Sequence, residues 1–228
     1  PEFEGAFKAL GRAVVDVGRL VAKQCDDYTA SQCPGYEKGK LFNLLQHSKC
    51  CKGRFLHYYP ADQVQQLMGM RENAVNDEAA PDVAFSDWCG WHNDHGSLTG
   101  LVPAMFIDAD GEEVPNPDPS AGLYIRSTTG TLVKVILPPG SSNLAFQIGE
   151  TTQIHTGGIL QATPHAVKGP SGHNAAGISR ETMAVFMEPE FSGEMSLPEG
   201  RTVEDVQSGE AIKFLPSSVK TLASRWQS

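Results

Sequence analysis

The sequence contains no hydrophobic run long enough to span a bilayer, which takes roughly 18 or more consecutive apolar residues. Its beginning does not resemble a secretory signal, because Arg12, Arg19 and Lys23 interrupt the apolar positions of the first segment. Basic residues are few: 18 lysines and arginines stand against 27 acidic residues, giving a formal net charge of −9. Because phosphate backbones and anionic lipids attract basic surfaces, we expect neither nucleic acid nor a membrane as a partner.

The cysteines are odd in number and irregularly spaced. No pair has the C-x2-C spacing of a zinc site, and adjacent cysteines of an extended chain point to opposite faces. This pattern indicates free thiols, so we expect the protein in a reducing, cytoplasmic compartment. The five cysteines are Cys25, Cys33, Cys50, Cys51 and Cys89.

Several common catalytic motifs are missing. The sequence has no Gly-x-Ser-x-Gly nucleophile elbow, no phosphate-binding loop and no cysteine–histidine nucleophile context. Residues 108–111 (D-A-D-G) superficially resemble a calcium loop, but the later ligands and the flanking helices of an EF-hand are absent. This segment is instead predicted to form a tight hairpin turn.

The N-terminal part of the chain, before residue 54, is predicted to be helical. With 228 residues, the chain suits one domain with a buried core, or a domain with a packed helical arm. Apolar residues of segment 4–30 recur at alternating spacings of three and four, which predicts an amphipathic helix. A second short helix is predicted through residues 41–45, and a third near 203–207. The apolar stripe of the first helix comprises Phe3, Phe7, Leu10, Val14, Val17 and Val21.

From residue 54 onward, short apolar runs are separated by glycine and proline. The first run, 55–59, is rich in aromatic residues and ends at Pro60, as a strand would. This spacing predicts an antiparallel sandwich or jelly roll, so the fold class is mainly β with flanking helices. The further predicted strands are 97–101, 104–107, 122–125, 132–137, 144–148, 159–163 and 183–187.

One short segment offers a candidate metal site. His92 and Asp94 are two residues apart, so on an extended strand both side chains leave the same face and can meet one ion. His165, which follows after several predicted strands, is the preferred third ligand. His95, His155 and His173 compete with it on composition alone. Two histidines and one carboxylate are typical of non-haem iron(II) oxygenases.

The sequence segments around these residues resemble motifs of a known protein family. Residues 92–99 (H-N-D-H-G-S-L-T) resemble the H-T-D-H-G-S-L-T stretch of isopenicillin N synthase-like oxygenases, the plant-type 2-oxoglutarate- and iron(II)-dependent dioxygenase superfamily. Residues 147–150 (Q-I-G-E) resemble its N-I-G-D, and 156–167 (T-G-G-I-L-Q-A-T-P-H-A-V) its T-N-G-x-x-x-A-T-P-H-R-V. Residues 180–189 resemble R-x-S…F…P, and 56–60 (L-H-Y-Y-P) resemble L-N-Y-Y-P. The resemblance spans roughly residues 54–190.

The resemblance implies a fold, a metal and a co-substrate. It implies a double-stranded β-helix core (a cupin-like jelly roll) over 54–190, a helical buttress in 1–53 and a C-terminal extension packed on the core in 191–228, all within one domain. It also implies that His92, Asp94 and His165 bind Fe(II). The cofactors would be Fe(II), 2-oxoglutarate and, as in a related branch, ascorbate.

The resemblance assigns further residues to 2-oxoglutarate. Arg180 and Thr182 would hold its far carboxylate, for which a guanidinium fork suits better than an ammonium group. Tyr59 and His57 fall where the family's second tyrosine and asparagine contact the co-substrate. His57 departs from that asparagine, which alters the contact, and Thr182 adds a methyl group to the usual serine.

The implied activity is oxidation, by default hydroxylation, of a small organic substrate with dioxygen, releasing succinate and CO2. Two alternatives remain open at this point. One is an iron oxidase that does not use 2-oxoglutarate, as isopenicillin N synthase itself does not. The other is a non-catalytic jelly-roll binding protein that kept the motifs without the activity. The primary substrate cannot be read from the sequence.

Overall fold

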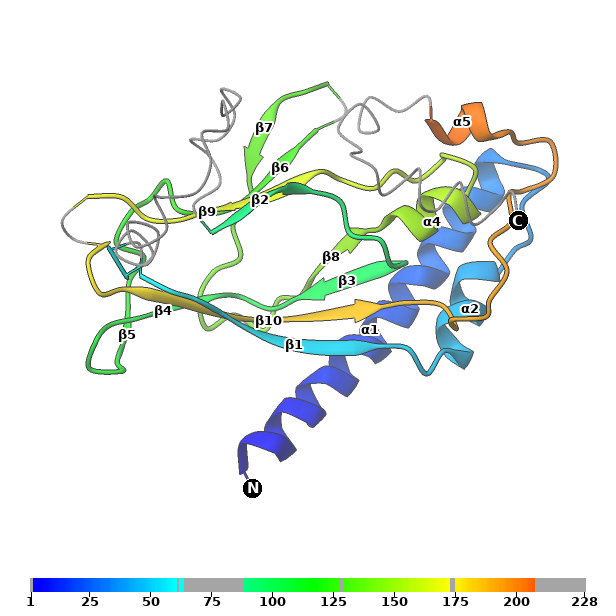
Figure 1. Cartoon of the computed structure of the whole chain (residues 1–228). Helices are drawn as coiled ribbons and strands as arrows, with labels where there is room; N and C mark the ends of the chain where they lie inside the picture. The colour runs from blue at the N-terminus through cyan, green and yellow to red at the C-terminus, as the bar shows by residue number, and fades with distance from the viewer. Residues whose placement is uncertain (1, 61, 64–87, 128, 173–174, 208–228) are drawn as a thin grey trace, which may run out of the picture.

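The chain forms two antiparallel β-sheets with a long N-terminal helix behind the larger sheet, as the computed structural model in Figure 1 shows. The structure describes residues 2–60, 62–63, 88–127, 129–172 and 175–207. The helices of this part are α1 (Glu2–Gln32), α2 (Lys40–His47), α4 (Glu150–His155) and α5 (Val203–Gln207). None of them is both long enough and apolar enough to cross a membrane.

The larger sheet is organised around its longest strand, β10 (Ser179–Met187). On one side β10 pairs with β1 (Lys52–Tyr58), and on the other with β3 (Leu98–Leu101) and β4 (Met105–Ile107). Strand β8 (Ala145–Ile148) pairs with β3, and β5 (Glu113–Val114) pairs with β4. All of these pairings are antiparallel, so the side chains of alternate residues on neighbouring strands share a face.

The smaller sheet has the strand order β2-β9-β6-β7. Its strands are β2 (Cys89–His92), β9 (His165–Lys168), β6 (Gly122–Arg126) and β7 (Leu132–Lys134). Two antiparallel sheets joined by long crossovers form the predicted double-stranded β-helix, and the fold-class prediction is confirmed.

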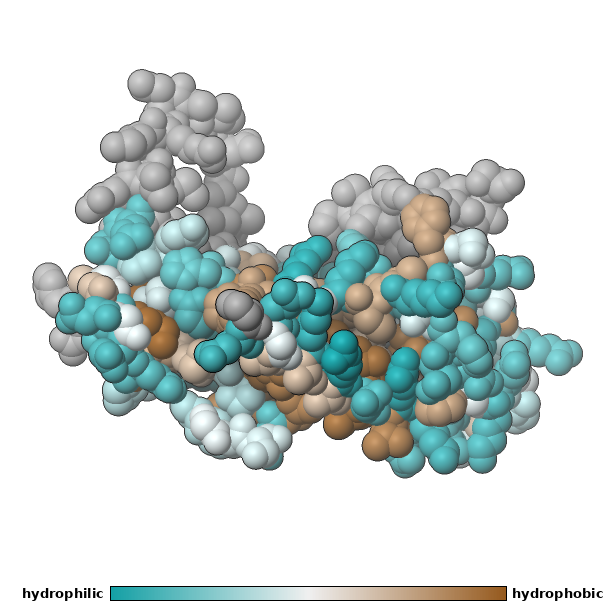
Figure 2. Space-filling view, turned by 90° about the horizontal axis from the view of Figure 1, so that it is seen from below, coloured by the Kyte–Doolittle hydropathy of each residue, from teal (hydrophilic) through white to brown (hydrophobic). Residues whose placement is uncertain are grey.

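Helix α1 packs on the larger sheet through small residues rather than through the whole predicted stripe. Val14, Gly18 and Ala22 are buried, whereas Leu10 and Val17 stay 40% and 39% exposed. The buried face of α1 differs from the predicted stripe because the helix approaches β10 closely at Gly18. A Cβ added at Gly18 would lie 2.4 Å from the Met187 sulfur. Figure 2 shows the molecule from below, where hydrophobic residues lie among the hydrophilic ones.

A buried carboxylate joins the first two helices. Asp26 of α1 is 1% exposed and accepts hydrogen bonds from the Leu41 and Phe42 amides at 2.9 and 2.8 Å. These amides belong to the first turn of α2, whose N–H groups have no partner within the helix. The Tyr36 hydroxyl also donates to Asp26, at 2.5 Å. Asp26 therefore caps α2 and fixes its position against α1.

Four of the eight strand predictions are confirmed within one residue at each end, namely 97–101, 104–107, 122–125 and 144–148. Strands β1 and β10 begin three and four residues earlier than predicted. The predicted strand 159–163 is a connection without strand structure, and the preceding residues form α4, which the sequence did not predict. The predicted strand 132–137 ends at Lys134 as β7. The hairpin turn at 108–111 is confirmed, with Gly111 at φ 86° between β4 and β5.

The described end of the chain lies against the helices. The Lys40 amine donates to the Ser196 carbonyl at 3.1 Å, and the Gln153 amide of α4 donates to the Val206 carbonyl at 2.9 Å. Strand β1 begins at Lys52, two residues before the expected start of the core. The remainder of the predicted C-terminal extension, 208–228, lies outside the described residues.

Candidate metal and co-substrate site

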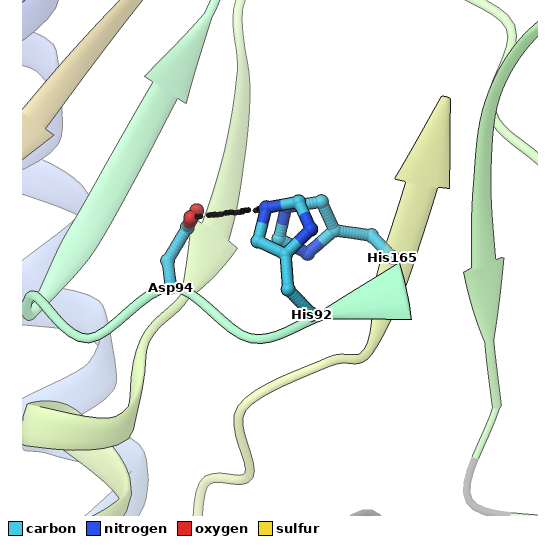
Figure 3. A group of neighbouring side chains, drawn as sticks. All are labelled: His92, Asp94 and His165. Carbon is cyan, nitrogen blue, oxygen red and sulfur yellow. Dashed lines mark ion pairs between the residues drawn. The ribbon is translucent and has the colours of Figure 1, made fainter. Parts of the chain in front are cut away.

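The structure brings His92, Asp94 and His165 together at one edge of the smaller sheet. His92 is the last residue of β2 and His165 the first of β9, and the two are direct cross-strand partners. Figure 3 shows their imidazole rings side by side, with the Asp94 carboxylate facing them. The ring centroids are 4.1 Å apart.

Asp94 is positioned by a loop and not, as expected, by strand alternation. Strand β2 ends at His92, so strand alternation does not aim the Asp94 side chain. A loop carries it instead, and the Glu150 amide at the start of α4 holds that loop by donating to the Asp94 carbonyl at 2.8 Å. The unpredicted helix α4 is therefore part of the scaffold of the site.

The three side chains have the spacing of ligands to one ion. Asp94 Oδ1 lies 3.8 Å from His92 Nε2 and 3.8 Å from His165 Nε2. All three ligand atoms lie within 4.8 Å of one another. His165 and Asp94 are buried, whereas the His92 side chain is 40% exposed, which leaves one side of the group open.

Backbone carbonyls orient both imidazole rings. His92 Nδ1 lies 2.8 Å from the Gly90 carbonyl, and His165 Nδ1 lies 3.0 Å from the Thr163 carbonyl. A carbonyl only accepts, so each Nδ1 carries a proton, and Nε2 is the nitrogen of each ring that can bind a metal. A partner of this kind on the other ring nitrogen is typical of metal-binding histidines.

The electrostatics of the pair are asymmetric. The contact with Cys89, then the Gly90 carbonyl and the Asp94 charge, outweigh burial and raise the pKa of His92 to about 9. Burial, followed by the charge of His92, lowers the pKa of His165. One imidazole of the pair thus holds a proton beside Asp94, and a metal ion binding there must displace it.

The residues fit a divalent metal. Asp94 is 8% exposed, and its Oδ2 is buried without a hydrogen-bond partner among the described residues. A buried carboxylate with an unused oxygen, beside two available imidazole nitrogens, suits a cation better than an apolar core. Two imidazoles and one carboxylate form the ligand set of non-haem Fe(II).

The competing histidines lie elsewhere. His95 Nδ1 is 2.7 Å from the Glu150 carboxylate, and His155 is buried with its Nδ1 3.2 Å from the Ser196 carbonyl. Neither belongs to the group of three, and His173 lies outside the described residues. Burial lowers the pKa of His155 to about 4, which keeps that ring neutral within the fold.

Gly149, at the end of β8, allows the loop that contains Asp94 and Gly96 to approach it closely. A Cβ at this position would lie 2.0 Å from the Gly96 carbonyl oxygen and 3.0 Å from the Asp94 carbonyl oxygen. Both contacts are with backbone, so the loop itself would have to move. We expect Gly149→Ala to destabilise the fold by about 1–3 kcal/mol and to weaken metal binding by about tenfold or more. Urea unfolding of the metal-free protein and a metal titration measure the two effects.

Gly172→Ala is the matched control, since a Cβ there meets no atom within 4 Å, although its φ of 87° carries its own strain. Gly172→Ala should lower stability without changing metal affinity. If Gly149→Ala bound metal as tightly as the wild type, the close approach would not be what positions Asp94.

The group of three opens into a cavity of about 700 Å³ between the two sheets. Arg180 lines this cavity from β10 and is only 9% exposed. Its guanidinium is hydrogen-bonded to Tyr58 and lies 5.2 Å from the centre of the Tyr58 ring, and burial lowers its pKa. It has no carboxylate partner among the described residues. A buried cation of this kind creates a site for an anion.

Thr182 lies beside Arg180, as its position two residues further along β10 requires. It also lines the cavity, and its hydroxyl donates to the Val102 carbonyl at 3.3 Å. A carboxylate only accepts hydrogen bonds, so the hydroxyl would turn its proton from this carbonyl toward such a ligand. The structure thus places Arg180 and Thr182 on the same cavity wall, as their spacing predicted.

His57 and Tyr59 are not brought to this wall, which corrects their expected placement. In the antiparallel pairing, Tyr58 lies opposite Arg180 and His57 lies opposite Glu181, so alternation turns His57 and Tyr59 to the other face. His57 Nδ1 lies 2.5 Å from the Glu181 carboxylate, and Tyr59 is 56% exposed. Tyr58, which the motif did not single out, is the tyrosine that lines the cavity beside Arg180.

Comparison with solved structures identifies the fold. A proposed oxygenase from Shewanella oneidensis is 19% identical with a TM-score of 0.55, covering 88% of this chain and 61% of that one. A proposed 2-oxoglutarate–Fe(II) oxygenase family protein from Caulobacter crescentus is 19% identical with a TM-score of 0.58, covering 100% and 59%. The fold is that of the 2-oxoglutarate- and iron(II)-dependent oxygenases. The oxygenase fold expected from the motifs is confirmed.

A third similar structure contains ligands. It is JOX2 in complex with 2-oxoglutarate, iron and JA, 16% identical with a TM-score of 0.56, covering 90% of this chain and 48% of that one. This chain therefore spans about half to three fifths of the length of these proteins. No protein-family model and no curated protein sequence matches the chain.

Proposed function

We propose that this chain is a non-haem iron(II)- and 2-oxoglutarate-dependent dioxygenase that hydroxylates a small organic substrate. One observation carries the proposal: two histidines and a buried carboxylate open into the same cavity as a buried arginine that has no acidic partner among the described residues. The first suits a divalent metal and the second suits an anion. The oxygenase fold of the similar structures supports this reading.

Each residue has a physical task in this proposal. His92, Asp94 and His165 would hold Fe(II), with the Gly90 and Thr163 carbonyls fixing the two rings. Bound iron would supply the activation of dioxygen, coupled to conversion of 2-oxoglutarate to succinate and CO2. Ascorbate would serve as a reductant that keeps the metal in its ferrous state.

The cavity wall would position the co-substrate. Arg180 would pair with the far carboxylate of 2-oxoglutarate through its planar fork, with the Thr182 hydroxyl beside it. Tyr58 holds the guanidinium in place by its hydrogen bond and ring contact. Apolar residues of both sheets make up much of the remaining wall and exclude water from the reacting groups. These include Leu56, Leu101, Phe106, Leu123 and Val167.

Succinate formation is the decisive measurement. Protein reconstituted without oxygen, with Fe(II), 2-oxoglutarate and ascorbate, is expected to form succinate slowly on exposure to air. His92→Ala should reduce this rate by at least about 100-fold, because it removes a metal ligand. His47→Ala, on the exposed end of α2, is the matched histidine control and should keep the wild-type rate.

The other outcomes separate the alternatives. Oxygen consumption without succinate would point to an iron oxidase that does not use 2-oxoglutarate. Failure to bind Fe(II) or 2-oxoglutarate would point to a non-catalytic jelly-roll binding protein. All five cysteines are free thiols in the structure, which supports the proposal that the protein works in a reducing compartment such as the cytoplasm.

A further inference from the structure

A row of hydrogen-bond donors crosses the cavity face of the larger sheet, away from Arg180. Phe186, Thr99 and Gln147 lie side by side on β10, β3 and β8. Arg54 of β1 lies opposite Ala184 and extends over the Phe186 ring, its guanidinium carbon 4.9 Å from the ring centre. All of these residues line the cavity. The guanidinium, the hydroxyl and the amide NH2 therefore lie along one part of the wall.

These donors have no acceptor within the described part of the chain. Thr99 is 2% exposed, and its hydroxyl oxygen is buried without a hydrogen-bond partner. The Gln147 side-chain nitrogen is also buried and unpartnered. Buried donors left unsatisfied cost free energy, so two of them on one cavity wall indicate a ligand that supplies acceptors.

Within the part of the chain that the structure describes, Arg54 has no acidic partner along the cavity. The acidic side chains of the described cavity wall are Asp94 and Glu188. Asp94 faces the two histidines, and Glu188 is paired with Lys52 at 2.7 Å. Arg54 is an exposed residue whose guanidinium carbon lies 4.9 Å from the centre of the Phe186 ring, a contact that does not neutralise its charge. A carboxylate would provide both the missing charge and the missing acceptors.

This row is separate from the Arg180 position and close to the metal group. Arg54 is level with Ala184, four residues along β10 from Arg180, which is a distance of about 13 Å along the strand. The five-carbon chain of 2-oxoglutarate is too short to reach both arginines. The Ser97 amide donates to the Met187 carbonyl at 2.9 Å, so this end of β10 adjoins the loop that carries Asp94.

We propose that the primary substrate is a carboxylate with a mainly apolar body, whose carboxylate binds Arg54, Thr99 and Gln147. The inference rests on the proposed function in one respect, namely that the substrate enters the cavity shared with the metal group. Arg54 provides the charge-assisted contact, and the two buried donors fix its direction. The apolar residues of the cavity then receive the body of the molecule beside the metal ligands.

The test uses phenylacetate, 3-phenylpropionate and 4-phenylbutyrate, each compared with its primary amide, which keeps the shape and removes the charge. Binding is measured by calorimetry on the full chain loaded with Zn(II) and 2-oxoglutarate, so no turnover is needed. We expect at least one acid to bind wild type about tenfold or more tightly than its amide. Arg54→Gln should reduce this preference to less than about threefold, and Gln147→Leu should weaken the acid more than the amide.

Lys52→Gln is the matched control, because it removes a cation two residues away on the same strand that already has Glu188 as partner. It should keep the preference for the acid. Equal binding of acids and amides by wild type, no binding of any acid at millimolar concentration, or an unchanged preference in Arg54→Gln would each overturn the inference. Affinity for 2-oxoglutarate, measured in the same titrations, reports separately on the proposed function. An effect of Arg54→Gln on 2-oxoglutarate alone would assign the row to the co-substrate and also overturn the inference.

Discussion

Replacing Asp94 with alanine is expected to lower Fe(II) affinity and succinate formation by at least about 100-fold while the fold is kept. The carboxylate is the only acidic member of the ligand group, and its Oδ2 has no hydrogen-bond partner among the described residues. Removing a buried carboxylate with an unused oxygen leaves no new donor unsatisfied. The free energy of unfolding of the metal-free protein should therefore change by only about 1 kcal/mol.

The stability measurement is as informative as the activity. Wild type should become more stable as Fe(II) is added without oxygen, because a ligand that binds only the folded state stabilises it. Asp94→Ala should lack this gain, while Asp110→Ala, in the exposed turn between β4 and β5, should retain it. Iron content equal to wild type in Asp94→Ala would remove Asp94 from the ligand set.

Replacing Arg180 with leucine is expected to weaken 2-oxoglutarate binding by about 100-fold or more, with iron binding retained. Truncating one partner of a buried, hydrogen-bonded charge pair costs about 2–5 kcal/mol, and each 1.4 kcal/mol is a factor of ten. Arg180 is 9% exposed and has no acidic partner among the described residues, so the unliganded variant should be about as stable as wild type. Calorimetric titration with 2-oxoglutarate on the Zn(II)-loaded protein measures the affinity.

A charge-conserving variant separates charge from geometry. Arg180→Lys keeps a cation but loses the planar fork that matches a carboxylate, so its affinity should lie between those of wild type and Arg180→Leu. Wild-type affinity in Arg180→Leu would falsify the assignment of this arginine to the co-substrate. It would also favour the iron oxidase that does not use 2-oxoglutarate.

Patterns among neighbouring residues were sufficient to predict most of the helices and strands and the three candidate metal ligands. The helical period of the first segment, the short apolar runs and the turn at Asp110-Gly111 depend on neighbouring residues, so they can be read along the chain. The spacing of His92 and Asp94 also identified two members of the group. Choosing His165 over three other histidines needed the motif around it, and the structure brings it to the other two.

The register between strands and the close packing of α1 on the sheet could not be predicted from neighbouring residues. The pairing of β1 with β10 decides that Tyr58, and not Tyr59, lies beside Arg180, because a one-residue slip turns every side chain to the opposite face. The face that α1 buries depends on how closely Gly18 approaches Met187. Both are properties of two segments far apart in sequence.

By itself, the sequence determined the elements, the jelly-roll class and the chemistry available at the metal site, because these follow from local periodicity and from the side-chain types present. The tertiary structure alone decided that a loop held by α4 delivers Asp94, and that Arg54, Thr99 and Gln147 from three strands form one wall. Cross-strand neighbours are set by hydrogen bonds between distant segments, whose partners no local pattern encodes.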